Sequence, residues 1–292
     1  MEVCTLLAAF GAGVFGTVIG GVATFIMVGL IALAGSIASM AGAADLATSV
    51  LAFGTVFGPH ISFTGAVTAA AYAGRRGYLK SGGADIMTSL NGLGKADVFL
   101  IGGITGVAGF LIQWFYANIC KFNTDTVAMT VATLGIITRL TIGKTGLLGT
   151  CESGGTRKIL SKNHIWNNLI LGLSIGFIVC GTGVYMIENY PVQAELITAN
   201  YANLFFSISA LTFILMMTDS GSSTPPTHHI TITSANAVMM SKNLWIGIVT
   251  AVVATFLADF FENTINSHND THWDPPAMTI FILSFVIFAV FK

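Results

Sequence analysis

Two short stretches of the chain carry a histidine followed by polar residues at helical spacing, and proline precedes each histidine. Proline is favoured in the first turn of a helix, where its missing N–H would have no partner anyway. Polar residues at steps of three or four then lie on one face of that helix. Imidazole, hydroxyl and amide groups on such a face can exchange hydrogen bonds with a polar solute. The candidate substrate-binding residues are His60, Thr64 and Thr68 in the first stretch and His229, Thr233 and Asn236 in the second.

Two other interpretations of these stretches stay open at this stage. Their polar and apolar residues also alternate, which is typical of an extended peptide, such as the unwound segment of a broken-helix transporter. Alternatively, the histidines and threonines hydrogen-bond neighbouring helices and have no further role. His228 has no histidine counterpart, since Pro59 aligns with it, and it receives less weight than His229.

Three aspartates are candidates for ion coupling. Asp125 and Asp274 each stand where a helix is expected to begin. An aspartate there can cap the helix by accepting a hydrogen bond from a backbone N–H, and we favour this interpretation. The alternative is that these carboxylates bind a coupling proton or cation, since ionisable groups within a bilayer commonly mark ion pathways. Asp259, near the end of an apolar segment, is the third candidate.

The sequence indicates neither a metal site nor a cofactor site. The four cysteines lie far apart without a C-x-x-C pair, which argues against a zinc site or a disulfide framework. His268 and His272 are four residues apart, but we expect their segment to be a solvated loop. Arg139 lies inside an apolar segment, and we expect it to reach the lipid headgroups or to face a transport pathway. We therefore predict no metal, no cofactor and no enzyme activity.

The composition places these residues in a membrane. Of 292 residues, 54% are hydrophobic and 9% are charged, and the mean hydropathy is +0.80. A soluble protein carries about 25% charged residues, so this chain has too few to cover a water-facing surface. The balance excludes a soluble enzyme and a protein that binds nucleic acid through a basic face. We predict an all-α polytopic integral membrane protein, with the lipid bilayer as its first partner.

Apolar segments of about 20 residues mark helices that can cross the bilayer. The sequence contains eight candidates, two of them shorter or less apolar, and two polar pieces that look too short to cross. We predict about 8–10 transmembrane helices, with the two short pieces as re-entrant or broken helices. The eight are Leu6–Ile37, Ala44–Phe57, Val98–Ala117, Thr126–Ile142, Ile165–Ile187, Leu196–Met217, Leu244–Phe261 and Ala277–Phe291, and the short pieces are Pro59–Ala73 and His228–Met240.

The chain repeats itself at an offset of 145 residues. Ile101–Asn118 aligns without a gap with Ile246–Asn263, with six identities in eighteen positions. Further matches flank this segment in the same order, in the two histidine stretches upstream and at Asp125 and Asp274 downstream. An internal repeat of this kind indicates a duplicated structural unit. We predict two homologous membrane repeats, residues 1–150 and 151–292, in one membrane domain without a soluble part.

The number of crossings per half decides whether the repeats are parallel or inverted. If the short pieces dip in and return, each half has four spans and the halves are parallel; if they cross, each half has five and the halves are inverted. The positive-inside rule modestly favours the parallel version, which leaves only Lys121 of the loop cations on the outer side. Inverted repeats of five spans are a common transporter plan, so both versions stay open.

These features predict a transporter or channel for a small polar solute or ion, driven by a gradient, with its site between the repeats. The alternatives are an integral-membrane enzyme acting on a lipid or quinone, and a scaffold subunit of a larger complex. We expect the cell membrane as the location, with a cytoplasmic N-terminus, and a homo-oligomer is compatible with the composition. On this hypothesis His229→Ala and Thr233→Ala should each reduce uptake while the protein stays folded.

Overall fold

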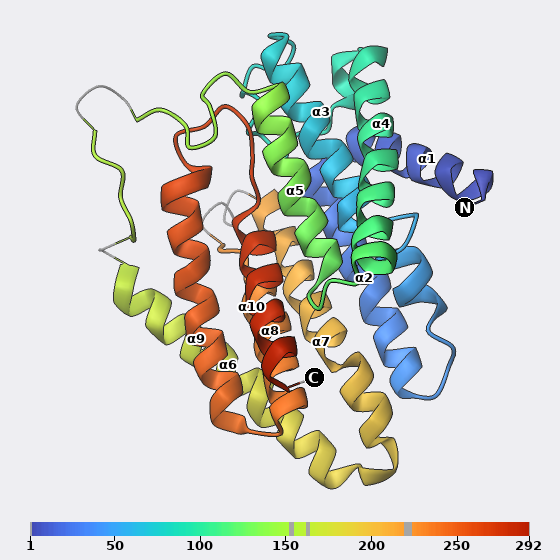
Figure 1. The fold of residues 1–292 in the computed structure, drawn as a ribbon, viewed down its shortest axis with the longest axis vertical. Helices are drawn as coiled ribbons and strands as arrows, with labels where there is room; N and C mark the ends of the chain where they lie inside the picture. Colours follow the sequence, from blue (N-terminus) through green and yellow to red (C-terminus); the bar gives the residue numbers. More distant parts are fainter. Residues whose placement is uncertain (1, 152–154, 162–163, 219–223, 292) are drawn as a thin grey trace.

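The computed structural model describes residues 2–151, 155–161, 164–218 and 224–291, and within those ranges it is helical with no strand (Figure 1). Within these ranges, five short helices are each continuous with a longer one: Pro59–Phe63 leads into α3, Phe115–Cys120 extends α4, Pro191–Gln193 leads into α7, Thr212–Met217 extends α7, and Glu262–Asn266 extends α9. The main helices are α1 (Val3–Ile19), α2 (Gly21–Met40), α3 (Thr64–Arg75), α4 (Ala96–Trp114), α5 (Thr126–Thr141), α6 (Ile165–Asn189), α7 (Ala194–Leu211), α8 (His228–Ser241), α9 (Leu244–Phe261) and α10 (Pro275–Phe291).

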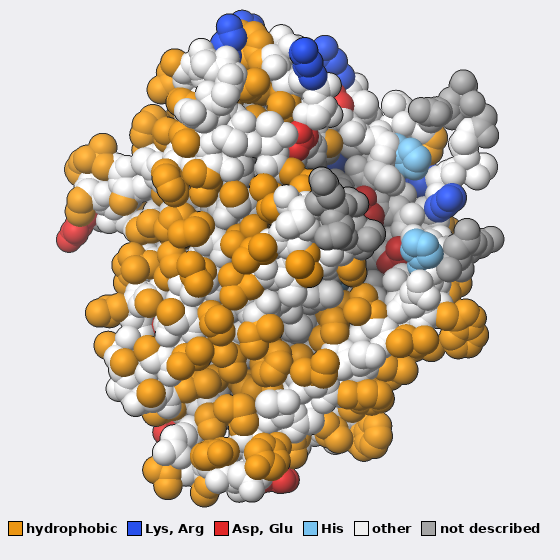
Figure 2. Space-filling model, turned by 180° about the vertical axis from the view of Figure 1, so that it is seen from behind, with side chains coloured by type: hydrophobic (Ala, Val, Ile, Leu, Met, Phe, Trp, Pro, Cys, Tyr) orange, Lys and Arg blue, Asp and Glu red, His pale blue; other side chains and the backbone are white. Residues whose placement is uncertain are grey.

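The chain is an all-helical membrane protein. Five helical segments are long and apolar enough to cross a bilayer, and α1, α5 and α10 are shorter apolar helices. Figure 2 shows hydrophobic side chains over most of the face seen, as expected of a surface that contacts lipid. The five segments are Gly21–Met40, Ala96–Cys120, Ile165–Asn189, Pro191–Met217 and Leu244–Asn266.

Two predicted spans differ from the structure. Leu6–Ile37 is not one helix, because the chain breaks at Gly20, whose φ of 94° suits glycine. The segment after α3 satisfies backbone groups freed by this break: Val22 N–H donates to the carbonyl of Ile86 at 2.9 Å, and Leu90 N–H donates to that of Thr17 at 3.3 Å. The second span, Ala44–Phe57, contains only the short helix Ala47–Ala52, which cannot cross a bilayer.

Matching helices of the two halves make matching contacts. α1 packs on α4 as α6 packs on α9, and α3 packs on α4 as α8 packs on α9. Glycine allows the close approach in both halves: Thr17 lies against Gly102 of α4, and Cys180 lies against Gly247 of α9, which is 145 residues further on. Between the halves, α2 packs on α7 and α5 on α10. The glycines that leave no room for a Cβ at the helix contacts within the halves include Gly13, Gly102, Gly106 and Gly172.

The matching helices α5 and α10 run in opposite directions. The hydroxyl of Thr124, before α5, donates to the carbonyl of Phe281 in α10, whereas Gly135 further along α5 lies against Trp273 before α10. Figure 1 shows the same reversal, since α5 rises and α10 descends. The parallel version favoured by the positive-inside rule therefore does not match the structure. The physical reason is parity: each half has five main helices, and an odd number reverses the next unit.

Four helices begin near the middle of the molecule and run outward in two opposite directions (Figure 1). The helix from Pro59 through α3 and its counterpart α8 diverge, and α5 and α10 do the same. A buried apolar cluster surrounds their starting points, with rings contributed by α2, α7 and the start of α3. Its largest members are Phe25, Phe63, Phe206, Val131, Ile232 and Ile280.

Candidate functional site

A central cavity of about 220 Å³ lies where these four helices begin. Pro59 and His228 line it from the starts of the α3 and α8 helices, and Asp125 and Asp274 line it from the residues before α5 and α10. The first turn of a helix has unpaired N–H groups that carry partial positive charge. Two carboxylates therefore share this cavity with four partly positive helix starts. The rest of the wall is mostly apolar and includes Phe25, Phe53, Phe63, Phe206, Val131, Ile280 and the amide of Asn203.

Asp125 and Asp274 both cap a helix and face the cavity. Oδ1 of Asp125 accepts a hydrogen bond from the N–H of Ala128 at 2.8 Å, and Oδ2 of Asp274 accepts one from Ala277 at 2.8 Å. The capping interpretation is thus confirmed, but it does not exclude a second role, because both residues also line the central cavity. An ionised aspartate deep in a bilayer costs about 2.5–3.5 kcal/mol, more than an ordinary cap of about 1 kcal/mol stabilises.

His228 is the imidazole of the central cavity. Its side chain is buried and packs among three phenylalanine rings, with centroid distances of 4.6 Å to Phe25 and 5.5 Å to both Phe206 and Phe213. Its Nδ1 has no hydrogen-bond partner among the described residues. Sequence reasoning gave this residue little weight because Pro59 aligns with it. The same alignment could have identified His228, because the aligned residues Pro59 and His228 line the same cavity.

In the first predicted stretch, the threonine hydroxyls make hydrogen bonds within the helix bundle. Thr64 donates to the carbonyl of His60 at 2.7 Å, and Thr68 pairs with Thr138 of α5 at 2.8 Å. His60 is buried beside Gly58 and is not among the residues that line the described cavities. Thr64 and Thr68 line only a closed space of about 10 Å³, which has room for about one water molecule.

The residues of the second predicted stretch are likewise separated, and only one of them lines a described cavity. Thr233 donates to the carbonyl of His229 at 2.7 Å, a bond to the preceding turn that threonine often makes in a helix. Neither Thr233 nor the partly buried Asn236 lines a described cavity. His229 lines a second space, and so the structure does not bring the six predicted residues together.

This second space is an outer cavity of about 390 Å³. Asp259 lies in its wall and accepts hydrogen bonds from the N–H and hydroxyl of Ser161, at 2.9 and 2.7 Å. Asp259 therefore anchors the segment before α6, away from the central cavity that contains the other two aspartates. The titratable groups of the outer cavity are His164, His229, Asp259, Glu262, His272 and Asp274.

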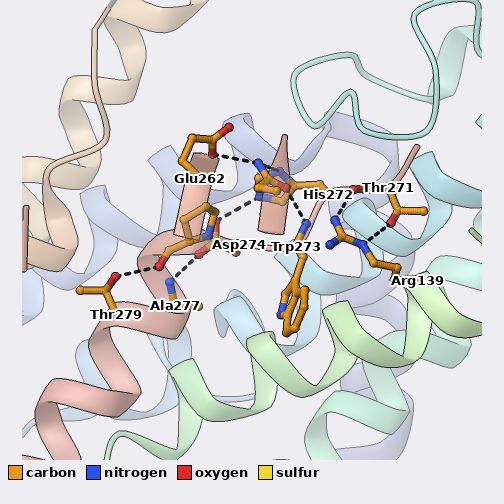
Figure 3. A network of polar contacts seen from close by, with 10 residues as sticks. Arg139, Glu262, Thr271, His272, Trp273, Asp274, Ala277 and Thr279 are labelled. Atoms are coloured by element: carbon orange, nitrogen blue, oxygen red, sulfur yellow. Dashed lines mark hydrogen bonds and ion pairs between the residues drawn. The ribbon is translucent and has the colours of Figure 1, made fainter. Parts of the chain in front are cut away.

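Asp274 lines both cavities and is bonded to His272 at their boundary. Nε2 of His272 lies 3.2 Å from Oδ1 of Asp274, and Nδ1 lies 3.5 Å from the amide nitrogen of Asn266, which also donates to Glu262 at 2.9 Å (Figure 3). Because the Asn266 nitrogen is a donor, this network assigns the imidazole proton to Nε2. The prediction of a solvated loop is wrong for His272, whose side chain is 11% exposed.

Arg139 holds the loop that positions His272. Its guanidinium donates to the hydroxyl and carbonyl of Thr271 at 3.1 and 2.8 Å, and to the carbonyls of Ile265 at 2.7 Å and Leu147 at 3.1 Å (Figure 3). It also lies over the ring of Trp273, 5.3 Å from its centroid. Arg139 thus occupies neither of its predicted places, the headgroups or the pathway, because loop carbonyls satisfy its N–H groups inside the protein.

The described parts of the chain contain no group of three His, Cys, Asp or Glu residues placed to hold a metal ion. The fold and this cavity define an all-helical polytopic membrane protein in which four helix starts meet around a mostly apolar internal cavity. The chain belongs to DUF7973, a family of unknown function, whose family model matches residues 1–158 and 175–292. Comparison with curated proteins and with solved structures gave no match.

Proposed function

We propose that the protein is a gradient-driven transporter for a small polar solute or ion, with its binding site in the central cavity. One observation carries this proposal: two carboxylates and an imidazole line one cavity at the meeting point of four helix starts. Interrupted helices and ionisable groups are tolerated at membrane depth where they line a cavity. The cavity also exceeds the roughly 150 Å³ that suffices for a ligand the size of benzene.

In this proposal the two halves are homologous inverted repeats, and the solute binds between them. The antiparallel contact of α5 with α10 and the matched contacts of α1 and α6 support that relationship. A solute that enters the cavity would exchange its hydration for the carboxylates of Asp125 and Asp274, the imidazole of His228 and the N–H groups of the helix starts. Rocking of one half against the other would then expose the cavity to each side in turn.

The site is less well suited to the two alternative functions. A lipid- or quinone-modifying enzyme needs reactive groups that a long apolar substrate can reach from the bilayer, whereas His228 is buried within the bundle and Asp125 is partly buried. A scaffold subunit needs its polar groups at the surface that contacts a partner. Enclosed carboxylates and imidazole fit a solute site better than either.

Uptake into liposomes that contain the purified protein tests the proposal. We expect a panel of radiolabelled ammonium, carboxylate and neutral solutes to include one that enters faster than into protein-free liposomes. Asp125→Asn should reduce that uptake about tenfold, equivalent to about 1.4 kcal/mol, whereas Asp45→Asn, at the exposed end of α2, should not. No protein-dependent flux of any solute, or equal flux in wild type and Asp125→Asn, would contradict the proposal.

The cell membrane and a cytoplasmic N-terminus remain part of the proposal. Cys4 is exposed near the N-terminus, and it can report the orientation once Cys120, Cys151 and Cys180 are replaced by serine. We expect a membrane-impermeant maleimide to label Cys4 only after the cells are opened. Labelling of intact cells would place the N-terminus outside.

A further inference from the structure

We propose that the coupling ion is the proton and that it reaches the central cavity from the outer cavity through His272 and Asp274. This inference rests on the proposed transport function and adds the ion and its route. It assigns a proton-carrying role to His272, which its position in the sequence does not suggest.

The first support is that one carboxylate separates two cavities. Asp274 lines both the central cavity and the outer cavity, and His272 lines the outer cavity. The imidazole and the carboxylate are 3.2 Å apart, so a proton can move between them along an existing hydrogen bond. A chain of polar groups continues outward through Asn266 to Glu262 (Figure 3).

The second support is that the two halves differ at this point. The residue two positions before Asp125 is Asn123, whereas the residue two positions before Asp274 is His272. A neutral amide cannot carry a proton at physiological pH, whereas an imidazole can. Within the described part of the chain, Asp125 accepts its backbone cap but no hydrogen bond from a side chain, so we place the proton route at Asp274.

The proton step follows from the tautomer. His272 rests with its proton on Nε2 and donates it to Oδ1 of Asp274. A proton from the outer cavity binds Nδ1 and opens the 3.5 Å contact with Asn266, the longest link in the chain. The Nε2–H bond then breaks and an O–H bond forms on Asp274. The result is a neutral carboxylic acid and a neutral imidazole with its proton on Nδ1, so charge and protons balance.

Other charged groups around this pair set the pH at which it responds. Anionic neighbours favour the protonated imidazole, and cationic ones oppose it. His272 and Asp274 face groups from α5, α8, α9 and the segment before α6, and Arg139 contacts the same loop through Thr271. The groups are Asp125, Arg139, His164, His228, His229, Asp259, Glu262 and, within the loop itself, Asp270.

Trp273 lies between the two residues in sequence and offers a direct optical test. Its side chain is 6% exposed, whereas the other three tryptophans are exposed and can be replaced by phenylalanine to leave Trp273 alone. A protonated imidazole quenches indole emission more than a neutral one does. We expect the emission of this single-tryptophan protein to change about 1.5-fold between about pH 5 and 8, where imidazole titrates. The three replacements are Trp114→Phe, Trp166→Phe and Trp245→Phe.

The variants of this experiment identify the group that titrates. His272→Gln should abolish the pH response, and Asp274→Asn should alter it because the carboxylate that accepts the Nε2 proton is replaced by a neutral amide. His268→Gln, in the same loop but exposed, is the matched control and should leave the response unchanged. A flat emission in wild type, or a response that survives His272→Gln, would overturn the proposal.

A liposome arm separates this inference from the transport proposal. We expect an imposed pH gradient to drive uptake of whichever panel solute is transported, and His272→Gln to remove that drive. Solute flux that ignores the pH gradient would overturn proton coupling and leave transport standing. If the emission of Trp273 changes with pH in a way that depends on His272, but no solute enters the liposomes, the proton site would be upheld and the transport proposal overturned.

Discussion

Asp125 and Asp274 cap equivalent helices with the same bond, 2.8 Å from a carboxylate oxygen to the backbone N–H three residues ahead, yet only Asp274 is bonded to an imidazole. The two carboxylates thus share a cavity and a capping role but differ in their access to protons. Under the proposed function, this difference within a nearly symmetric site would separate a residue that binds solute from a residue that also couples it to an ion gradient.

We therefore expect Asp125→Asn and Asp274→Asn to have different kinetic signatures. Both should lower solute uptake about tenfold, since each removes a charge from the cavity wall. Only Asp274→Asn should also abolish the stimulation of uptake by a pH gradient. Initial rates measured with and without an imposed gradient test this prediction. Equal stimulation in the two variants would contradict it.

The structure changes which histidine and threonine substitutions should matter. His228→Phe keeps a ring against Phe25 but removes the one imidazole among the described residues that line the central cavity, so uptake should fall about tenfold. Thr233→Val removes a hydroxyl that bonds its own helix, so uptake should stay within about twofold of wild type. Uptake by the two variants, normalised to folded protein, checks this. A larger loss of uptake in Thr233→Val than in His228→Phe would instead support the substrate-binding residues predicted from the sequence.

The contact of α4 with the first turn after Pro59 should be intolerant of any side chain. A Cβ at Gly109 would lie 1.7 Å from the carbonyl oxygen of His60, so Gly109→Ala must push two backbones apart. We expect destabilisation by about 1–3 kcal/mol, seen as a lower unfolding temperature in detergent. Gly11→Ala, where nothing lies within 4 Å, is the control and should gain up to about 1 kcal/mol of helix stability.

Lysine should not be able to replace Arg139. Lysine keeps the charge but lacks the planar fork that reaches Thr271, Ile265 and Leu147 at once. We expect Arg139→Lys to lower the free energy of unfolding by about 2 kcal/mol and to loosen the loop, seen as faster proteolysis. Arg75→Lys, at an exposed site, should change stability by less than about 0.5 kcal/mol. Similar effects of the two substitutions would contradict the structural role.

The turn around Asp85 should make stability fall in acid. Burial acts to raise the pKa of Asp85, but hydrogen bonds from Ser81, Met87 and Thr88 outweigh it and hold the pKa below its usual range. A lowered pKa in the folded state stabilises the fold above about pH 4, the pKa of a free aspartate, and this stabilisation is lost as pH falls through the folded-state pKa. Asp85→Asn should therefore remove part of the pH dependence of the unfolding temperature below about pH 5. A variant as acid-sensitive as wild type would contradict this.

The helix starts could be predicted from sequence because their chemistry is local. Pro59 begins a helix, and Asp125 and Asp274 cap the helices that follow them. The break at Gly20 was not predicted: Leu6–Ile37 was expected to be one span, although Gly20 and Gly21 are adjacent glycines within that apolar run. A single glycine with positive φ was enough to divide one predicted span into two helices.

The cavity residues could not be predicted, because helix spacing does not say which face of a helix turns inward. The first turns after Pro59 are π-helical through Phe63, which changes the rotation of every residue that follows. Phe63 therefore faces the central cavity while His60 does not. His272 was missed for a different reason: its burial depends on Arg139, 133 positions earlier, and no local pattern records that contact.

The glycine contacts within each half limit how the protein can move. Where α1 meets α4, and where α6 meets α9, glycines bring the two helix backbones close together, so little side-chain bulk separates them. Each half should then behave as a rigid body. The interface between the halves contains aromatic rings such as Phe25 and Phe206, whose centroids are 5.4 Å apart in an edge-on contact that tolerates rotation of one ring relative to the other. In the proposed transport cycle, the protein should therefore open to either side of the bilayer along this aromatic interface.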